Sequence, residues 1–258
     1  MSPLYPTAFF EGQMTGSVSS AEVVVPLVLS EFRVRSVVDF GCGVGGWLKA
    51  FENNGITDYL GIDGEYVSRH QLRIPDNRFS PQDLTAPKKL GRRFDLACSL
   101  EVAEHLPASC AEQFVSALVE AAPVILFSAA VPGQGGTNHV NEQWQSHWAN
   151  LFQKNGYVAI DCIRPKIFYD TRVEYWYRQN ILIFCNPDYC PKHFSPTINR
   201  YELDRIHPEL LIAIKSGPQT GRAALNQIFR DTRVLINAFL RKARLMPSLG
   251  AKIKLSRP

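Results

Sequence analysis

Three glycines at alternate positions follow an acidic residue in the segment VVDFGCGVGGWL (37–48). They are Gly41, Gly43 and Gly45, and Asp39 precedes them at the end of a β-branched run. Glycine has no Cβ, so a turn of this composition lets a ligand lie against the backbone where a helix begins. The segment therefore predicts a strand-to-helix turn that binds a nucleotide-type cofactor. The alternative is a turn whose glycines serve only close packing of strand and helix.

Further acidic residues follow at later points in the chain. Asp63 ends the run YLGID (59–63), where a carboxylate can accept hydrogen bonds from ribose hydroxyls. It could instead cap a following helix. Asp83 and Leu84 lie in a loop before the run FDLACSL (94–100), and the acid there can face an adenine ring or cap a turn.

Strand-like and helical runs alternate from the glycine turn onward, which predicts an α/β protein with a parallel sheet and helices on both of its faces. A helix beginning at Ser20, with Pro26 in its first turns, precedes the sheet. The last two strands have no clear helix between them and are expected to form an antiparallel edge. The predicted strands are 36–40, 59–63, 94–100, 124–130, 157–163 and 180–185, and the predicted helices after the glycine turn end at Gly55 or span 112–122 and 141–156.

In their order and spacing, VVDFGCGVGGW, YLGID, QDL and FDLACSLEVAEHL resemble the successive motifs of class I S-adenosylmethionine-dependent methyltransferases. The resemblance covers about residues 35–185. It implies a Rossmann-like, mostly parallel seven-stranded sheet with an antiparallel last strand. It also implies S-adenosylmethionine as the cofactor.

The same resemblance implies which residues bind this cofactor. The glycines let the backbone approach its methionine part, and the acid before them organises the turn or meets the amino group. The acid that ends the second strand holds the ribose hydroxyls, and the Asp-Leu pair meets the adenine. Two residues after the fourth strand line the pocket. The complete set is Asp39, Gly41, Gly43, Gly45, Asp63, Asp83, Leu84, Glu101 and Val102.

Methyl transfer to an oxygen benefits from a general base, and histidine is the usual choice. His139 lies in the glycine-containing loop VPGQGGTNHVNEQW, and His105 follows the fourth strand. Each could instead have a structural role, His139 as a cap of the next helix and His105 as a packed residue at a helix start. The candidates for acceptor binding are Asn138, Asn141, Trp144 and Tyr175, the last with core packing as its alternative.

Two other kinds of site are not expected. A catechol-type metal site would need Asp and Asn ligands after the fourth and sixth strands, but position 101 is Glu and no Asp-Asn pair follows it. We therefore expect no required metal. An Asn-Pro-Pro-Tyr-type tetrapeptide is absent after the fourth strand, so nucleic acid is not an expected partner.

Charge divides the chain unevenly. The net charge is +4, but residues 221–258 contain nine Lys or Arg and one Asp. Residues 222–246 show helical periodicity with an apolar face and a basic face. This helix is expected to pack on the body, or to lie on an anionic membrane surface, with nucleic-acid binding a weaker third interpretation. The predicted organisation is a covering segment 1–35, a methyltransferase domain 36–190 and an extension 191–258.

The scattered cysteines have neither disulfide nor zinc spacing, and no signal peptide or membrane-spanning run is visible. We expect a cytoplasmic protein, peripheral to the membrane if the basic helix binds there. The predicted function is O-methylation of a small polar acceptor such as a sugar or glycan intermediate. The alternatives are a natural-product phenol or a nitrogen centre as acceptor, or a non-catalytic cofactor-binding scaffold, against which the intact cofactor turn argues. The oligomeric state stays undetermined.

Overall fold

The structure is a computed structural model that describes residues 7–197 and 199–216 of the 258-residue chain. The chain divides into two compact units, Met1–Leu210 and Leu211–Pro258. All strands of the described residues and all predicted site residues belong to the first unit. The predicted basic helix 222–246 lies outside the described residues.

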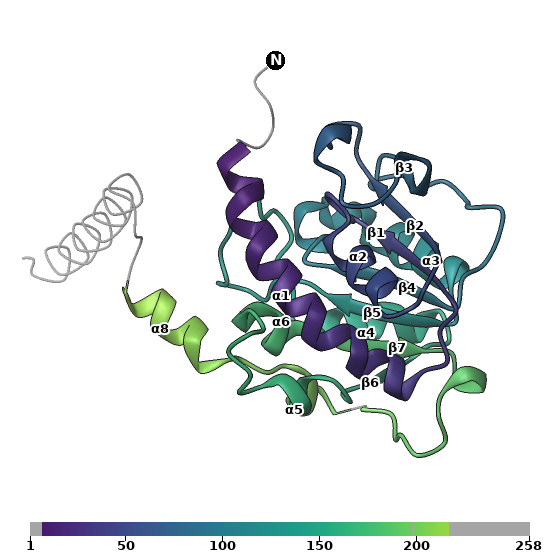
Figure 1. Cartoon of the computed structure of the whole chain (residues 1–258). Coiled ribbons are helices and arrows are strands. Elements are labelled where there is room, and N and C mark those ends of the chain that lie inside the picture. Colours follow the sequence, from purple (N-terminus) through teal and green to yellow (C-terminus); the bar gives the residue numbers. More distant parts are fainter. Residues whose placement is uncertain (1–6, 198, 217–258) are drawn as a thin grey trace, which may run out of the picture. The chain divides into compact units, whose positions relative to one another are not determined.

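A seven-stranded sheet forms the centre of the first unit, with the strand order β3-β2-β1-β4-β5-β7-β6 (Figure 1). β7 runs antiparallel to both of its neighbours, whereas the other neighbouring strands are parallel. The α/β fold with an antiparallel last strand is therefore confirmed. The strands are β1 Ser36–Phe40, β2 Asp58–Asp63, β3 Phe79–Pro81, β4 Leu96–Leu100, β5 Val124–Ser128, β6 Val158–Ile160 and β7 Leu182–Cys185.

Only β3 was missed by the sequence analysis. It has three residues and ends in a proline, so it is shorter than any pattern of alternation that a sequence could show. The central strands β4, β5 and β7 are buried along their whole length, as expected for apolar strands covered on both faces. The parallel arrangement brings the carboxyl ends of β1, β2, β4 and β5 to one edge of the sheet.

Helices cover both faces of the sheet. α1 and α2 share one buried cluster with one set of strand residues, and α3 and α4 share a second cluster with the alternate residues (Figure 1). The α-helices are α1 Thr7–Glu31, α2 Gly46–Asn53, α3 Ala111–Ala121, α4 Gln145–Lys154, α5 Arg164–Ile167, α6 Tyr175–Asn180, α7 Arg200–Leu203 and α8 Pro208–Ser216. Short 3₁₀ turns span Arg69–Gln71, Asp76–Arg78, Ala103–His105, Ala108–Cys110 and Pro187–Tyr189. No described helix combines the length and the apolar character that crossing a membrane requires.

The predicted start of the first helix was wrong. α1 begins at Thr7, so Ser20 and Pro26 lie inside it. The Ser19 and Ser20 hydroxyls donate to the Gly16 carbonyl at 3.0 and 2.7 Å, a bond within the helix rather than an N-terminal cap. Tertiary packing on the sheet stabilises the helix enough to tolerate the proline.

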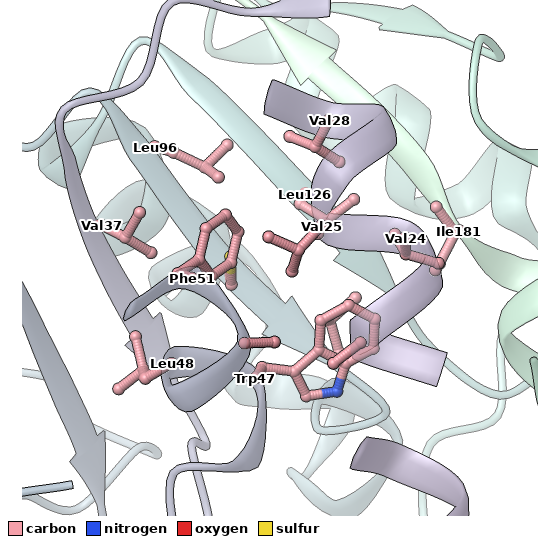
Figure 2. Close-up of a cluster of buried hydrophobic side chains, with 14 of the residues drawn as sticks. Val24, Val25, Val28, Val37, Trp47, Leu48, Phe51, Leu96, Leu126 and Ile181 are labelled. Atoms are coloured by element: carbon pink, nitrogen blue, oxygen red, sulfur yellow. The ribbon is translucent and has the colours of Figure 1, made fainter. Parts of the chain in front are cut away.

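A hydrophobic cluster holds α1 and α2 on the sheet (Figure 2). Figure 2 shows Val25 and Val28 of α1 beside Phe51 of α2, over strand residues such as Leu126. Trp47, in the first turn of α2, contacts Tyr177 of α6 edge to face, with ring centroids 5.2 Å apart. Full burial of such side chains contributes about 1.5–3 kcal/mol each. Because α2 starts directly after Gly45, this packing also positions the glycine turn.

The helix α4 begins later than predicted, at Gln145 instead of residue 141. Two backbone N–H groups of residues 141–144 form hydrogen bonds outside the helix. The Asn141 N–H donates to the Glu104 carbonyl at 3.0 Å, and the Gln143 N–H donates to the Ala130 carbonyl at 3.1 Å. These bonds hold residues 141–144 against the ends of β4 and β5. The loop after β5 is thereby fixed at both of its ends.

Candidate active site

The glycine turn joins β1 to α2 and has an unusual backbone. Gly41, Gly43 and Gly45 all have left-handed φ angles, of 85°, 54° and 85°. The N–H groups of Gly41 and Cys42 both donate to the Ile62 carbonyl, at 2.7 and 3.1 Å. The end of β2 therefore holds the turn in place.

The three glycines differ in what surrounds them. A Cβ on Gly41 would lie 2.3 Å from Val102 Cγ2, and one on Gly45 would lie 2.9 Å from Ile74 Cγ1. A Cβ on Gly43 would meet nothing within 4 Å. Gly41 and Gly45 are thus required by the packing of the protein itself, whereas Gly43 leaves open space at the helix start. A cofactor can approach the backbone there, which fits the predicted binding of the methionine part.

Asp63 stands at the end of β2 and faces the turn. Its carboxylate accepts hydrogen bonds from the Gly43 N–H at 2.7 Å, the Gly64 N–H at 2.7 Å and the Tyr66 hydroxyl at 2.5 Å. Since the two carboxylate oxygens have four lone pairs and these bonds use three, the group can accept one further hydrogen bond from a ribose hydroxyl. Its role is therefore to connect the turn to β2, and no helix follows it directly.

Asp39 is buried at the end of β1. Its burial and the nearby charge of Asp63 raise its pKa to about 7. A cation next to Asp39 would stabilise its ionised form and lower this pKa. The environment thus fits the predicted contact with the amino group of the cofactor.

The two residues predicted to contact adenine, Asp83 and Leu84, have different environments in the structure. The exposed Asp83 carboxylate accepts from the Thr85 N–H at 2.8 Å and from its hydroxyl at 2.7 Å, which is the turn-capping alternative. Leu84 is buried. The backbone before them runs along the end of β2, because Gln82 N–H donates to the Asp63 carbonyl at 2.8 Å. An adenine contact of this pair remains a prediction.

Glu101 follows β4 directly and has a left-handed φ of 56°, which is rare for a residue with a long side chain. Its N–H donates to the Ser128 carbonyl at 3.0 Å. Its carboxylate accepts from Asn180 Nδ2 at 3.1 Å and from Gln134 Nε2 at 2.9 Å. The backbone and side chain of Glu101 are thus held by three separate segments, and the next residue, Val102, lies over the glycine turn.

The two predicted histidines come together at the ends of β4 and β5. The rings of His105 and His139 meet edge to face, with centroids 4.9 Å apart. The fully buried Glu104 lies beside them, and one ligand atom from each of the three side chains lies within 4.8 Å of the others. We call these three residues the Glu-His-His cluster.

The loop after β5 is organised around Glu142. Its carboxylate accepts from the N–H groups of Gly133 and Gly135, both at 2.8 Å, and lies 2.9 Å from His139 Nδ1. A Cβ on Gly136 would lie 2.3 Å from His139 Nε2, so the backbone passes very close to the imidazole. Glu142 therefore orients His139 within the loop.

Burial and neighbouring ionisable groups shift the pKa values of two residues of the cluster, His105 and Glu104. Burial, and then the neighbouring His139, lower the pKa of His105 to about 4. Burial and the charge of Glu101 raise the pKa of Glu104 well above its usual range. At neutral pH, His105 is therefore an uncharged imidazole.

The residues predicted to bind the acceptor have different positions. Asn138 is exposed in the loop, with a left-handed φ of 61°. Asn141 is buried and accepts from Gln143 Nε2 at 3.0 Å, so it anchors the loop. Trp144 is partly exposed at the N-cap position of α4. Tyr175 is half-buried, and the charge of Glu101 is among the causes that raise its pKa.

The sequence analysis missed four polar residues of this region. Glu104 and Glu142 belong to or support the Glu-His-His cluster, and Gln134 and Asn180 hold Glu101. A signal for Glu104 was present, since Glu101, Glu104 and His105 lie within five positions after a strand. No local signal marks Asn180, which reaches the site from a distant part of the chain.

Comparison with known proteins decides the family. A family model described as a methyltransferase domain matches residues 21–179, more than half of the chain. The chain belongs to this methyltransferase family. It is an S-adenosylmethionine-dependent methyltransferase, as predicted, and its glycine turn and acidic residues fit that cofactor.

The chain is similar to several solved structures of low sequence identity. One is a chain of the complex between the Haloferax volcanii Trm112 methyltransferase activator and a methyltransferase, with 15% identity, a TM-score of 0.50, and coverage of 68% of this methyltransferase and 94% of that chain. The methyltransferase domain of bacterial CtHen1 has 20% identity and a TM-score of 0.49, with 66% and 99% covered. The magnesium protoporphyrin IX methyltransferase of Synechocystis has 17% identity and a TM-score of 0.46, with 66% and 80% covered. No curated protein sequence matches the chain.

The role of Asp63 can be tested by calorimetry with S-adenosylmethionine and S-adenosylhomocysteine. Asp63→Asn is expected to weaken both affinities at least tenfold, because hydrogen bonds to a charged group contribute about 1.5–3 kcal/mol. Asp58→Asn is the matched control, since Asp58 begins the same strand and makes only exposed ion pairs. Equal cofactor affinity in the two variants would contradict the ribose assignment.

Stability measurements can separate two effects of a side chain at position 41, which are the contact with Val102 and the strain of a left-handed φ. Gly55, at the end of α2, also has a left-handed φ of 90° but open space around a Cβ. Gly55→Ala is expected to lower the free energy of unfolding by about 1–2 kcal/mol. Gly41→Ala is expected to lower it by a further ~1–3 kcal/mol, because Val102 must move. Urea unfolding measures both, and equal losses would argue against the contact.

The raised pKa of Asp39, about 7, predicts a pH dependence of stability. The folded protein retains a proton that the unfolded chain releases near pH 4. As pH rises from about 4 through about 7, the wild-type protein should therefore lose free energy of unfolding relative to Asp39→Asn, and the loss should level off once Asp39 is ionised in the folded protein as well. Urea titrations of both proteins at several pH values, without cofactor, measure the difference. A difference that stays constant with pH would refute the assignment.

Proposed function

We propose that this methyltransferase transfers the methyl group of S-adenosylmethionine to a hydroxyl oxygen of a small polar acceptor, such as a sugar or glycan intermediate. The observation that carries the proposal is the pairing of His139 with Glu142 at the edge of the sheet where the cofactor turn also lies. We assign the acceptor to this edge of the sheet, next to His139 and the cofactor turn.

The polar surroundings support a polar acceptor. Glu101 is held by Gln134 and Asn180, and Gln179 Nε2 donates to the Gln134 side-chain oxygen at 3.2 Å. This network connects the ends of β4 and β5 with α6. Amides and carboxylates at fixed positions favour hydroxyl-bearing ligands, because an apolar ligand would displace water from the lone pairs and N–H groups that this network leaves unused without replacing its hydrogen bonds.

His139 is the group placed to take up the hydroxyl proton. Glu142 lies at its Nδ1, which leaves Nε2 to accept a proton. In the transfer step, the bond between methyl carbon and sulfur breaks and its electron pair stays on sulfur. A bond forms between the hydroxyl oxygen and the methyl carbon, and the hydroxyl proton passes to His139. The products are the methyl ether and S-adenosylhomocysteine.

Positioning and exclusion of water supply much of the rate of such an in-line displacement. The loop 131–144 supports this role because its backbone is tied down on two sides. Val140 and Asn141 donate to the Glu104 carbonyl, and Gly133 and Gly135 donate to Glu142. We assign this loop to the acceptor side of the site.

The proposal is tested by turnover with isotope-labelled S-adenosylmethionine against a metabolite extract, with mass identification of the methylated product. The expected product is a methyl ether of a hydroxylated small molecule. His139→Ala is expected to lower kcat by about 10²–10⁴, the usual contribution of a general base, with unchanged cofactor affinity.

His147→Ala provides the matched control, because His147 lies on α4 beside Trp148 and outside the cluster. This variant should retain wild-type turnover. Intact turnover in His139→Ala, or a product methylated on nitrogen, would refute the proposed function.

A further inference from the structure

We propose that the Glu-His-His cluster of Glu104, His105 and His139 binds a divalent first-row transition-metal cation, such as Mn²⁺, Co²⁺ or Zn²⁺. The binding part of this inference is independent of the acceptor. Its catalytic consequence rests on the proposed function. The set contains neither Asp nor Asn and so differs from the catechol-type metal site that the sequence lacks.

The geometry brings the ligand atoms almost to coordinating distance. One atom from each side chain lies within 4.8 Å of the other two. Ligands about 2.0–2.2 Å from a common ion are at most about 4.4 Å apart, so small side-chain rotations would close the set. The backbone already holds the two segments together, since Val140 and Asn141 donate to the Glu104 carbonyl at 2.9 and 3.0 Å.

Glu104 is the strongest indication that something is bound here. Its side chain is fully buried close to the Ala130 backbone and the Glu101 carboxylate, but neither of its oxygens forms a hydrogen bond of normal geometry with a described residue. His105 Nδ1 is also buried and without such a partner. Unpaired buried polar groups cost several kcal/mol, and burying a carboxylate usually requires a cation or a donor. A divalent ion between these side chains would satisfy all of these atoms at once.

Both histidines are oriented as metal ligands usually are. His139 Nδ1 lies 2.9 Å from Glu142 Oε1, and this contact leaves its Nε2 with a free lone pair. His105 forms a hydrogen bond with the backbone of Asn138, which leaves its unpartnered Nδ1 available. Outer carboxylate and carbonyl partners of this kind fix the tautomer of a metal-binding histidine.

The donor set indicates the class of metal. One carboxylate and two imidazoles form a mixed oxygen and nitrogen set, which favours Mn²⁺, Co²⁺ or Zn²⁺ over Mg²⁺ and Ca²⁺. Glu101 lies next to the cluster, but its oxygens are bonded to Asn180 and Gln134. It therefore adds negative charge beside the ion without serving as a ligand in this arrangement.

Three protein ligands leave coordination positions open for water or an acceptor hydroxyl. A hydroxyl bound to the ion has a lowered pKa and can release its proton to solvent. In the metal-bound protein, His139 is then a ligand, and the ion activates the hydroxyl. The ion would also stabilise the alkoxide oxygen until this oxygen attacks the methyl carbon.

The experiment uses the full chain, stripped with a chelator and dialysed, without cofactor or acceptor. Calorimetry with Mn²⁺ and with Zn²⁺, and electron paramagnetic resonance of bound Mn²⁺, are expected to show one site, with Mg²⁺ binding more weakly. Glu104→Gln, His105→Asn and His139→Gln should each weaken Mn²⁺ binding at least tenfold. Glu112→Gln and His147→Asn, matched in residue type but outside the cluster, should bind Mn²⁺ as the wild-type protein does.

S-adenosylmethionine affinity shows that each variant is folded, and His139→Gln is the variant of choice because its side chain lies on a loop and is partly exposed. Absence of a stoichiometric site, or Mn²⁺ affinity unchanged in His139→Gln, overturns the inference. Loss of turnover with chelator and recovery with Mn²⁺ supports the catalytic consequence, and chelator-resistant turnover of a hydroxyl acceptor overturns it. A protein that binds Mn²⁺ but methylates no hydroxyl overturns only the proposed function.

Discussion

The hydrogen bond between the Gly43 N–H and the Asp63 carboxylate, 2.7 Å long, joins the first two strands at the edge where the cofactor is predicted to bind. The turn that contains Gly43 is left-handed at three positions and is also anchored on the Ile62 carbonyl. Its other end is fixed by α2, whose Trp47 and Phe51 are buried under α1. Cofactor binding and core packing are therefore coupled in this turn, since movement of either strand or of α2 would distort it.

The side of the site that we propose for the acceptor is built on a different principle. Here buried charged and polar groups, rather than close backbone contacts, shape the site. Glu101 has a strained backbone and a carboxylate that accepts a hydrogen bond on each oxygen, whereas the buried Glu104 carboxylate forms no hydrogen bond of normal geometry with a described residue. Such features cost stability and persist where surrounding structure enforces them, which is typical of functional sites. The two glutamates lie three positions apart, yet their environments assign them different roles.

The architecture and the cofactor motifs were predictable because they depend on local features. Strand length, β-branched runs and glycine spacing are short-range patterns, and they placed β1, β2, β4 and β5 and the cofactor turn. The errors arose where a local signal had two physical meanings. Ser20 can cap a helix or bond back within one, and the packing of α1 on the sheet decided for the second. Likewise, Asn141 could lie in the first turn of a helix or donate its N–H to the Glu104 carbonyl. The structure shows the second arrangement, because the loop after β5 holds Asn141 against Glu104.

By itself, the sequence determined the fold class, the methyl donor and the residues that form the glycine turn, since these follow from the order and spacing of contiguous motifs. It also predicted His105 and His139 as candidate bases, but not that their side chains are in contact. Only the tertiary structure decided that these histidines meet beside Glu104, that Glu142 orients His139, and that Asn180 holds Glu101. The physical reason is that parallel strands separated by long connections end at one edge of the sheet, so side chains distant in sequence converge there.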